Sequence, residues 1–344
     1  MKGMGDSLYH NNGDGTFTDV SASARVDDAS GYYGLGVVWS DLNDDGRPDL
    51  FVADDSTPNY LYRNDGKGHF TNLSFMSGTA VNGEGAETAG MGVAVCDYNH
   101  SGRFSVVLTT FEDQAATLYN NDGAMNFTDV SFASAISIPT LKFLKWGVGC
   151  EDLDNDGWPD IFIVNGHVYP QVDSLNAGAK YRETKIVLRN NRNGSFHDVT
   201  GQAGPALLVA EPSRGAAFGD LDNDGRIDVV VENIDGKPMI LHNASTGKNH
   251  WVTLHLTGKR SNRLAIGAKV KITAGAMAQI GEVRSGGSYL SQNDLRLHFG
   301  LGDATKVDKL EIRWPSGETS SFGNINADHF YLMSEGDGAV HLER

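Results

Sequence analysis

The chain has 344 residues, with 28 Lys and Arg against 44 Asp and Glu, and a formal net charge of −16 at pH 7. Of these side chains, 17 basic and 34 acidic ones lie before residue 250, whereas 11 and 10 lie after it. The chain lacks the clustered Lys and Arg that contact phosphates, which argues against nucleic-acid binding. No apolar run approaches the roughly 18 residues of a membrane-spanning helix. The uneven charge predicts two regions with different tasks.

A short unit recurs along the first 245 residues: Leu-Tyr-x-Asn, then a Gly, Asn and Asp cluster, then Phe-Thr. Its asparagines are spaced 53, 57, 69 and 53 residues apart, at Asn11, Asn64, Asn121, Asn190 and, in a degraded copy, Asn243. Apolar residues on both sides of a Gly-Asp turn predict a β-hairpin.

Between these hairpins, one apolar segment enters an acidic loop and another leaves it, as residues 34–40 and 50–53 do around the first loop. Such short segments rich in β-branched residues favour strands. One period is therefore four strands over about 55–68 residues, slightly longer than a typical β-propeller blade. We expect an all-β chain with four four-stranded units, at 34–73, 90–131, 146–199 and 215–256, after a lone hairpin at 8–19. Because a ring usually needs more blades, we expect a propeller that is incomplete at its N-terminus; a closed five-blade ring is the alternative.

Three acidic loops follow one pattern, Asp-x-Asp/Asn-x-Asp-Gly-x-x-Asp. Positions 1, 3, 5, 7 and 9 are Asp41, Asn43, Asp45, Arg47 and Asp49; Asp152, Asp154, Asp156, Trp158 and Asp160; and Asp220, Asp222, Asp224, Arg226 and Asp228. Oxygen ligands at these positions, with a backbone carbonyl at position 7 and a Gly at 6 for the turn, suit Ca²⁺. We therefore expect about three Ca²⁺ sites, against the alternative of plain Asx turns.

Two neighbouring interpretations are set aside. An EF-hand needs a bidentate Glu at position 12, where this chain has Val52, Ile163 and Val231. A fourth loop, residues 97–105, keeps only one carboxylate, Asp97, and we expect it to hold the turn without binding an ion tightly.

Residues 8–245 resemble the FG-GAP/VCBS repeats of integrin-type propellers, and the resemblance implies Ca²⁺ bound between the first two strands of a blade. The rest of the chain resembles the ASPIC/UnbV domain of cartilage acidic protein-like and bacterial secreted proteins. The motifs that carry this second likeness are Asn249-His-Trp251, Ser261-Asn262-Arg263, Ile266-Gly267-Ala268-Lys269-Val270, Gly287-Ser-Tyr289-Leu-Ser-Gln292, His298-Phe-Gly300-Leu-Gly302 and Arg313-Trp314-Pro315-Ser-Gly317. The stretch 165–173 also resembles propellers of such proteins, whereas Leu264 replaces an Asp that the family usually carries.

We expect two domains, residues 1–248 for the propeller repeats and 249–344 for a small antiparallel β domain. Residues 251–256, 268–273 and 307–314 alternate apolar and polar side chains, as half-buried strands do. The resemblance implies an extracellular or periplasmic protein, although the chain begins without the apolar segment of a signal peptide. Its two cysteines, Cys96 and Cys150, are too few to indicate a disulfide framework, and their pairing stays open.

An insertion at residues 165–185 holds four candidate partner-binding side chains, His167, Tyr169, Tyr181 and Arg182. Long loops on rigid scaffolds often carry binding residues, and the alternative is a loop that packs over the domain junction. Metalloprotease, serine-hydrolase and phosphate-loop motifs are missing. We therefore expect a calcium-binding, non-catalytic adhesion or recognition module for a protein or glycan; a polysaccharide-active enzyme with its site on a propeller face is the alternative.

Overall fold

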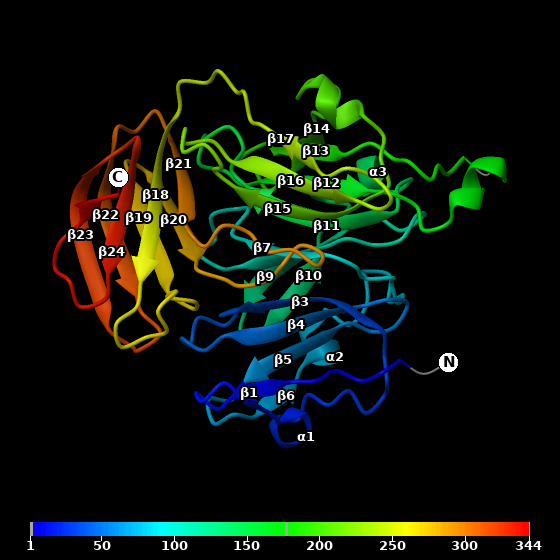
Figure 1. Ribbon diagram of the computed structural model, residues 1–344, viewed down its shortest axis with the longest axis horizontal. Coiled ribbons are helices and arrows are strands. Elements are labelled where there is room, and N and C mark those ends of the chain that lie inside the picture. The colour runs from blue at the N-terminus through cyan, green and yellow to red at the C-terminus, as the bar shows by residue number, and fades with distance from the viewer. Residues whose placement is uncertain (1–2, 176–177, 344) are drawn as a thin grey trace.

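The computed structural model describes residues 3–175 and 178–343, and it is all-β apart from a few single helical turns. Three four-stranded antiparallel sheets and one three-stranded sheet follow one another along the chain (Figure 1). The first sheet consists of β3 (Gly34–Ser40), β4 (Asp49–Asp54), β5 (Tyr60–Asn64) and β6 (Phe70–Asn72). The second consists of β7 (Val93–Cys96), β8 (Ser105–Leu108), β9 (Thr117–Gly123) and β10 (Asn126–Asp129). The third consists of β11 (Lys145–Glu151), β12 (Asp160–Asn165), β13 (Ile186–Asn190) and β14 (Phe196–Asp198), and the fourth of β15 (Ser213–Gly219), β16 (Asp228–Asn233) and β17 (Met239–Leu241).

A lone hairpin of β1 (Tyr9–Asn11) and β2 (Phe17–Asp19) precedes these sheets, as the sequence predicts. The helical turns are α1 (Ser21–Ala24), α2 (Ser74–Ser77), α3 (Ser137–Thr140) and two 3-10 turns, η1 (Pro170–Ser174) and η2 (Pro205–Leu208). The prediction of a four-stranded unit at residues 215–256 is wrong, because this sheet has three strands. The strand around residue 251, β18 (His250–Thr257), pairs with strands of the C-terminal domain instead.

The first strands of the four sheets lie beside one another in chain order, β3 against β7, β7 against β11 and β11 against β15. This is the arrangement of propeller blades, in which the inner strands of successive sheets meet near a common axis. Strands β4, β7, β8 and β12 are buried along their whole length because neighbouring sheets cover both faces. Double-sided burial explains why these segments are continuously apolar rather than alternating.

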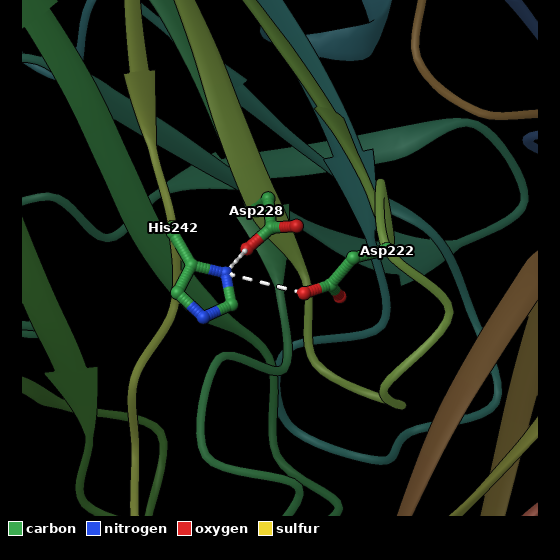
Figure 2. A group of neighbouring side chains, drawn as sticks. All are labelled: Asp222, Asp228 and His242. Carbon is green, nitrogen blue, oxygen red and sulfur yellow. Dashed lines mark hydrogen bonds and ion pairs between the residues drawn. The ribbon is translucent and has the colours of Figure 1, made fainter.

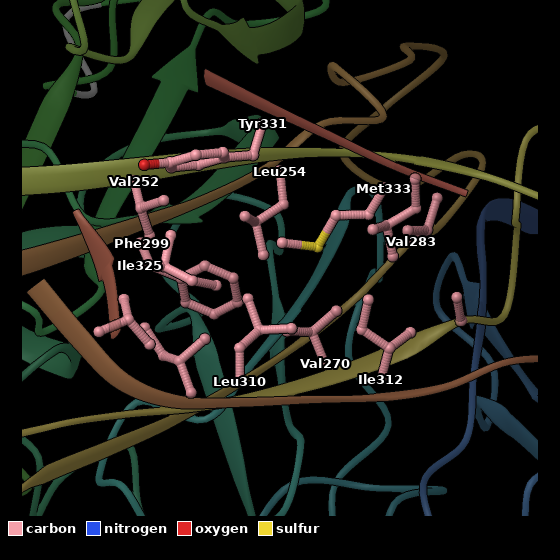
Figure 3. Close-up of a cluster of buried hydrophobic side chains, with 14 of the residues drawn as sticks. Val252, Leu254, Val270, Val283, Phe299, Leu310, Ile312, Ile325, Tyr331 and Met333 are labelled. Atoms are coloured by element: carbon pink, nitrogen blue, oxygen red, sulfur yellow. The ribbon is translucent and has the colours of Figure 1, made fainter. Parts of the chain in front are cut away.

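The C-terminal domain packs two four-stranded sheets face to face. One sheet has the order β21 (Leu297–Gly302), β18, β24 (His329–Ser334), β25 (His341–Leu342), and the other β20 (Met277–Glu282), β19 (Lys269–Ala274), β22 (Lys306–Arg313), β23 (Thr319–Asn326). Leu254, Phe299, Leu310 and Met333 fill the space between them (Figure 3). The three strands predicted from alternation are present, but β18 and β24 run parallel, so the domain is not wholly antiparallel.

The segment between β20 and β21 lies across the inner strands of the repeat sheets (Figure 1). Ser288 exchanges backbone hydrogen bonds with Val93 of β7, and its hydroxyl accepts one from the N–H of Val148 in β11. The backbone N–H of Phe218 in β15 donates to the side-chain oxygen of Asn293, and the carbonyl of Phe218 accepts the N–H of Asp294. These contacts place the C-terminal domain next to the acidic loops. The expected boundary at residues 248 and 249 falls between β17 and β18 and stays a prediction.

Candidate metal loops

The four acidic loops connect the first and second strands of each sheet and share one backbone arrangement. In each, the carboxylate at position 1 accepts hydrogen bonds from the backbone N–H groups at positions 5 and 6. The N···O distances are 3.0 and 3.0 Å at Asp41, 2.8 and 2.8 Å at Asp97, 3.1 and 2.7 Å at Asp152, and 3.1 and 2.8 Å at Asp220. The Gly at position 6 has φ between +75° and +90° in all four, which explains its recurrence.

The carboxylate at position 9 fastens each intact loop to the third strand of its own sheet. Asp49 accepts from the N–H of Asn64 at 2.9 Å, and Asp160 accepts from the N–H of Asn190 at 2.8 Å. Asp228 does the same with Asn243 at 2.8 Å. Burial raises the pKa of both Asp49 and Asp160 to about 7. In these two loops, position 9 thus carries a buried acidic group whose ionised form burial disfavours.

The repeated asparagine joins neighbouring blades. The side-chain amide of Asn121 donates to the carbonyl of Leu42 in the preceding loop at 2.8 Å and to Phe104 in its own loop at 2.9 Å. Asn190 and Asn243 make the equivalent pairs of bonds. The spacing of these asparagines reveals the repeat, but their role between blades becomes visible only in the structure.

The loop at residues 152–160 buries three of its four carboxylates, those of Asp152, Asp156 and Asp160. Asp152, Asp154 and Asp156 each offer an oxygen, and these atoms lie within 4.8 Å of one another. Burial, followed by the charges of the neighbouring carboxylates, holds the pKa of Asp152 well above its ordinary value. Two arginines of the third blade's outer hairpin partly balance this charge. Arg192 lies 2.8 Å from Asp156, and Arg189 pairs with Asp154.

The loop at residues 220–228 offers two overlapping sets of ligands. Asp220, Asp222 and Asp224 form one set, and Asp222, Asp228 and His242 form the other. Figure 2 shows the ring of His242 turned toward both carboxylates, with Nδ1 3.2 Å from Asp228 and 3.7 Å from Asp222. The sequence reasoning missed His242. It stands directly before a repeat asparagine, where the other copies carry His10, Arg63, Asn120 and Arg189, so the repeat pattern alone does not single it out.

The loop at residues 41–49 differs because basic side chains of the C-terminal domain form ion pairs with it. Arg313 of β22 pairs with Asp41 and lies 3.1 Å from Asp44, and Lys269 of β19 lies 2.8 Å from Asp44. Within the described ranges, its carboxylates do not form one of the three-residue groups found in the other two loops. A cation here therefore competes with Arg313 for Asp41.

The loop at residues 97–105 supports its neighbour. His100 stacks on Trp158 with ring centroids 3.9 Å apart, and its Nε2 lies 2.9 Å from the carbonyl of Gly157. Asp97 keeps the turn with the same two backbone bonds as the other loops. That this loop binds no ion stays a prediction.

Comparison with known proteins bears on the whole chain. A family model described as an FG-GAP-like repeat matches residues 3–52, 41–108 and 174–231, and one described as ASPIC and UnbV matches residues 258–340. The chain carries FG-GAP-like repeats followed by an ASPIC/UnbV domain. Both resemblances expected from the sequence are thereby confirmed.

Cartilage acidic protein 1 is a distant homologue of this FG-GAP and ASPIC/UnbV chain. The Homo sapiens protein is 25% identical over 310 residues, which cover 88% of this chain and 44% of that protein. The Mus musculus protein is 24% identical over 313 residues, covering 88% and 45%. This chain therefore spans less than half the length of these relatives.

Solved structures show weaker likeness. A lectin from Agrocybe aegerita, described as recognising non-reducing terminal N-acetylglucosamine, has a TM-score of 0.32 and 18% identity over 71% of this chain and 76% of its own. The V. cholerae biofilm matrix protein Bap1 has a TM-score of 0.32 and 12% identity over 94% of this chain and 59% of its own.

The insertion in the third FG-GAP blade does not bring its four candidate residues onto one surface. His167 is 3% exposed, its Nε2 lies 3.1 Å from Glu112, and its Nδ1 accepts the N–H of Tyr169 at 3.0 Å. Arg182 pairs with Glu211. Only Tyr169, at 62% exposure, presents a large apolar surface to solvent. Tyr181 is partly buried, and its N–H donates to Asp173.

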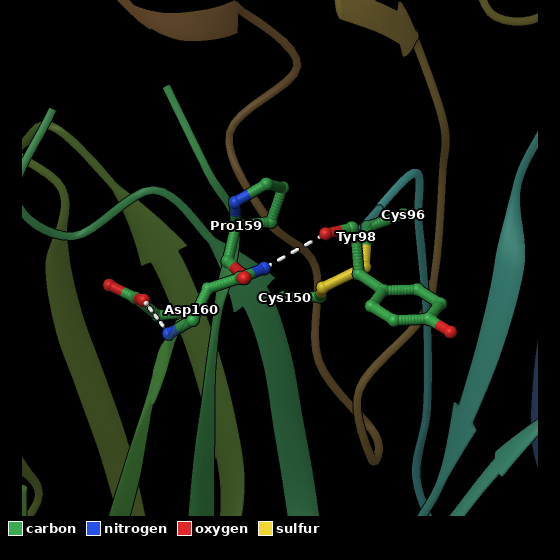
Figure 4. The surroundings of a disulfide bond; sticks show 6 residues. Cys96, Tyr98, Cys150, Pro159 and Asp160 are labelled. Atoms are coloured by element: carbon green, nitrogen blue, oxygen red, sulfur yellow. Dashed lines mark hydrogen bonds between the residues drawn. A yellow bond between two sulfur atoms is a disulfide. The ribbon is translucent and has the colours of Figure 1, made fainter. Parts of the chain in front are cut away.

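The two cysteines form a disulfide between the second and third FG-GAP blades (Figure 4). Cys96 ends β7 directly before Asp97, and Cys150 lies in β11 two residues before Asp152. The bond therefore clamps the bases of two adjacent acidic loops. The two cysteines are 54 residues apart, close to one repeat, so they occupy similar positions in adjacent blades, and this spacing is the sequence signal for the bond. In the described part of the chain, no helix is long and apolar enough to cross a membrane.

Proposed function

We propose that this chain is a calcium-binding, non-catalytic recognition module of an extracellular protein, with a protein or a glycan as its ligand. The observation that carries the calcium proposal is the loop at residues 152–160. Three carboxylate oxygens converge there on a preformed backbone turn, and two of their side chains have a raised pKa.

The donor set fits Ca²⁺. Carboxylates and the position-7 carbonyl are hard oxygen ligands, and the flexible coordination of Ca²⁺ accepts such short loops. A bound dication offsets both the cost of burying the charges of Asp152, Asp154 and Asp160 and the repulsion between these carboxylates. We propose the same role for residues 220–228 through Asp220, Asp222 and Asp224, and a weaker one for residues 41–49, where Arg313 competes for Asp41.

The proposed compartment rests on the Cys96–Cys150 bond, because disulfides persist in oxidising environments. The proposed recognition role rests on the rigid repeats and on the long third-blade insertion that exposes Tyr169. In this role the ion fixes the loops of the scaffold and takes no part in chemistry.

Calorimetric titration of the metal-free chain with CaCl₂ tests the calcium sites. We expect Asp152→Asn and Asp220→Asn each to remove one binding event. Asp97→Asn is the matched control, since it replaces one of the two side-chain oxygens that accept the same backbone N–H bonds, in a loop with a single carboxylate. Ca²⁺ at about 100 times its Kd stabilises the fold by roughly 2.7 kcal/mol for each site. A melting temperature that responds neither to Ca²⁺ nor to EDTA, with no heat of binding, would contradict the proposal.

Recognition is tested separately with the Ca²⁺-loaded chain on a glycan array and a panel of extracellular matrix proteins. Saturable binding that weakens with Tyr169→Ala supports the proposal. Turnover of a polysaccharide substrate would instead favour the enzymatic alternative.

A further inference from the structure

A second group of carboxylates lies at the far end of the first sheet, away from the acidic loops. Asp54 ends β4, opposite the end at which residues 41–49 enter it. Asp6 comes from the segment before β1, and Asp28 from the segment between α1 and β3. Asp6 and Asp54 both face Gly34. A Cβ placed on Gly34 would lie 3.0 Å from Oδ1 of Asp6 and 3.7 Å from Oδ1 of Asp54.

Asp54 is fully buried, neither of its carboxylate oxygens has a well-formed hydrogen bond, and the backbone N–H of Tyr60 is the one donor close enough to favour its ionised form. Oδ2 of Asp6 is also buried and unpartnered. Asp28 differs, because it accepts bonds from the hydroxyl of Tyr60 at 2.5 Å and the N–H of Tyr32 at 2.6 Å. A buried carboxylate with so little hydrogen bonding is costly to ionise, so Asp54 must either gain a compensating positive charge or take up a proton.

Two other blades have a hydrogen-bond donor at the position of Asp54. Asp54 pairs across the sheet with Gly34, in the register in which Asn165 pairs with Lys145 and Asn233 with Ser213. The amides of Asn165 and Asn233 donate to backbone carbonyls at 2.6 and 2.8 Å. An ionised Asp54 cannot donate, so it cannot adopt this solution.

The third blade places a cation at this point. The ammonium of Lys145, which is fully buried, donates to four carbonyls at 2.7–3.1 Å, those of Phe111, Gln114, Thr140 and Phe143. The first blade has Gly34 at the same register position, with carboxylates around it instead of carbonyls. The protein thus encloses an amine at this position in the third blade, with a pKa that burial lowers to about 7, and only carboxyl groups in the first.

We propose that Asp54 and Asp6 bind a hard divalent cation, Ca²⁺ or Mg²⁺, at the position that the ammonium of Lys145 takes in the third blade. Asp28 adds negative charge beside the ion and keeps its own hydrogen bonds. Carboxylate oxygens are the ligands that both ions prefer, and two ionised groups match a dication. Asp6 also borders a surface pocket lined by Ser7, Asp19 and Asp27.

Electrostatics support the proposal. Burial, then the charges of Asp6 and Asp28, raises the pKa of Asp54 to about 8, and the Tyr60 amide offsets this only in part. Burial and the charge of Asp28 raise the pKa of Asp6 to about 6. A bound dication reverses both effects by favouring the ionised carboxylates.

Calorimetry with CaCl₂ and separately with MgCl₂ tests this site on the full chain. We expect Asp54→Asn to lower the number of bound ions by one for at least one of the two metals. The replacement restores the amide found in two other blades, so the fold should tolerate it. Asp55→Asn, which alters the neighbouring carboxylate, is the control and should leave the number unchanged.

Gly34→Lys is a second, independent variant. Its ammonium would take the place among the carboxylates that the ammonium of Lys145 takes among carbonyls in the third blade, so we expect one ion fewer and a melting temperature that EDTA lowers less than in the wild type. An unchanged number of bound ions in both variants and with both metals would overturn the proposal and identify Asp54 as a neutral acid. The loops at 152–160 and 220–228 have their own variants, so either set of sites can fail alone.

Discussion

Breaking the Cys96–Cys150 bond should cost the FG-GAP repeats about 4 kcal/mol of unfolding free energy at 25 °C. The bond joins residues 54 positions apart, and the chain-entropy relation for a closed loop of that size gives this magnitude. Both sulfurs are buried in the cluster shared by the second and third sheets, with Leu118 and Ile161 among its members. In this relation the cross-link stabilises the fold by reducing the entropy of the unfolded chain. Its loss also loosens the contact between two acidic loops.

Equilibrium urea unfolding, followed by tryptophan fluorescence, compares the oxidised protein, the same protein after reduction, and Cys96→Ala/Cys150→Ala. The reduced protein keeps the sulfur atoms, so its difference from the oxidised form measures the cross-link alone. The alanine variant adds the packing loss. A difference below about 1 kcal/mol between oxidised and reduced protein would refute the reasoning, and so would two alkylatable thiols in the untreated protein.

Three further predictions concern charged side chains at the loops and the domain contact. Arg192→Gln should raise the Ca²⁺ affinity of residues 152–160 several-fold in calorimetry, because it removes a guanidinium 2.8 Å from Asp156; unchanged affinity would mean that the arginine moves aside freely. Arg313→Gln should strengthen Ca²⁺ binding at residues 41–49 and lower the unfolding free energy of the metal-free chain by about 1 kcal/mol; weaker binding would exclude competition. Burial lowers the pKa of His298 to about 4 from its ordinary 6.5, so its stabilising contribution is present above pH 6.5 and is lost as pH falls toward 4. The loss should reach about 2–3 kcal/mol in pH-dependent unfolding and shrink in His298→Gln, and an equal pH dependence in both proteins would contradict it.

The repeat architecture was predictable because it is written in local spacing. The turn residues, the apolar strands and the position-6 glycines each act within one blade, so residues 34–73 fold into the expected four strands. The acidic positions were predictable for the same reason: their backbone bonds span only four or five residues, as from Asp152 to Gly157.

What the sequence did not reveal depends on contacts between distant segments. The pattern at residues 251–256 indicates a strand but not which sheet it joins, and the partners of β18 lie 43 residues and more away in the sequence. Its parallel pairing with β24 is likewise a property of the assembled domain. Partner binding by the insertion stays a prediction, and the sequence did not reveal that His167 is buried beside Glu112 of the preceding blade.

The ASPIC/UnbV domain contacts three of the acidic loops, and each contact bears differently on ion binding. Arg313 pairs with a carboxylate oxygen of Asp41 and so competes with a cation there, whereas Arg296 bonds to the carbonyl of Asp220 and the side chain of Asn223 and not to their loop's carboxylates. His298 holds Asn155 by its side chain at 2.7 Å. Linkage is reciprocal: if Arg313 weakens Ca²⁺ at residues 41–49, then Ca²⁺ at that loop weakens the domain contact by the same factor. Ca²⁺ in the loops held by Arg296 and His298 carries no such penalty. Filling the sites from low to high Ca²⁺ should therefore stabilise the repeats first and loosen the ASPIC/UnbV domain only when the loop at residues 41–49 binds.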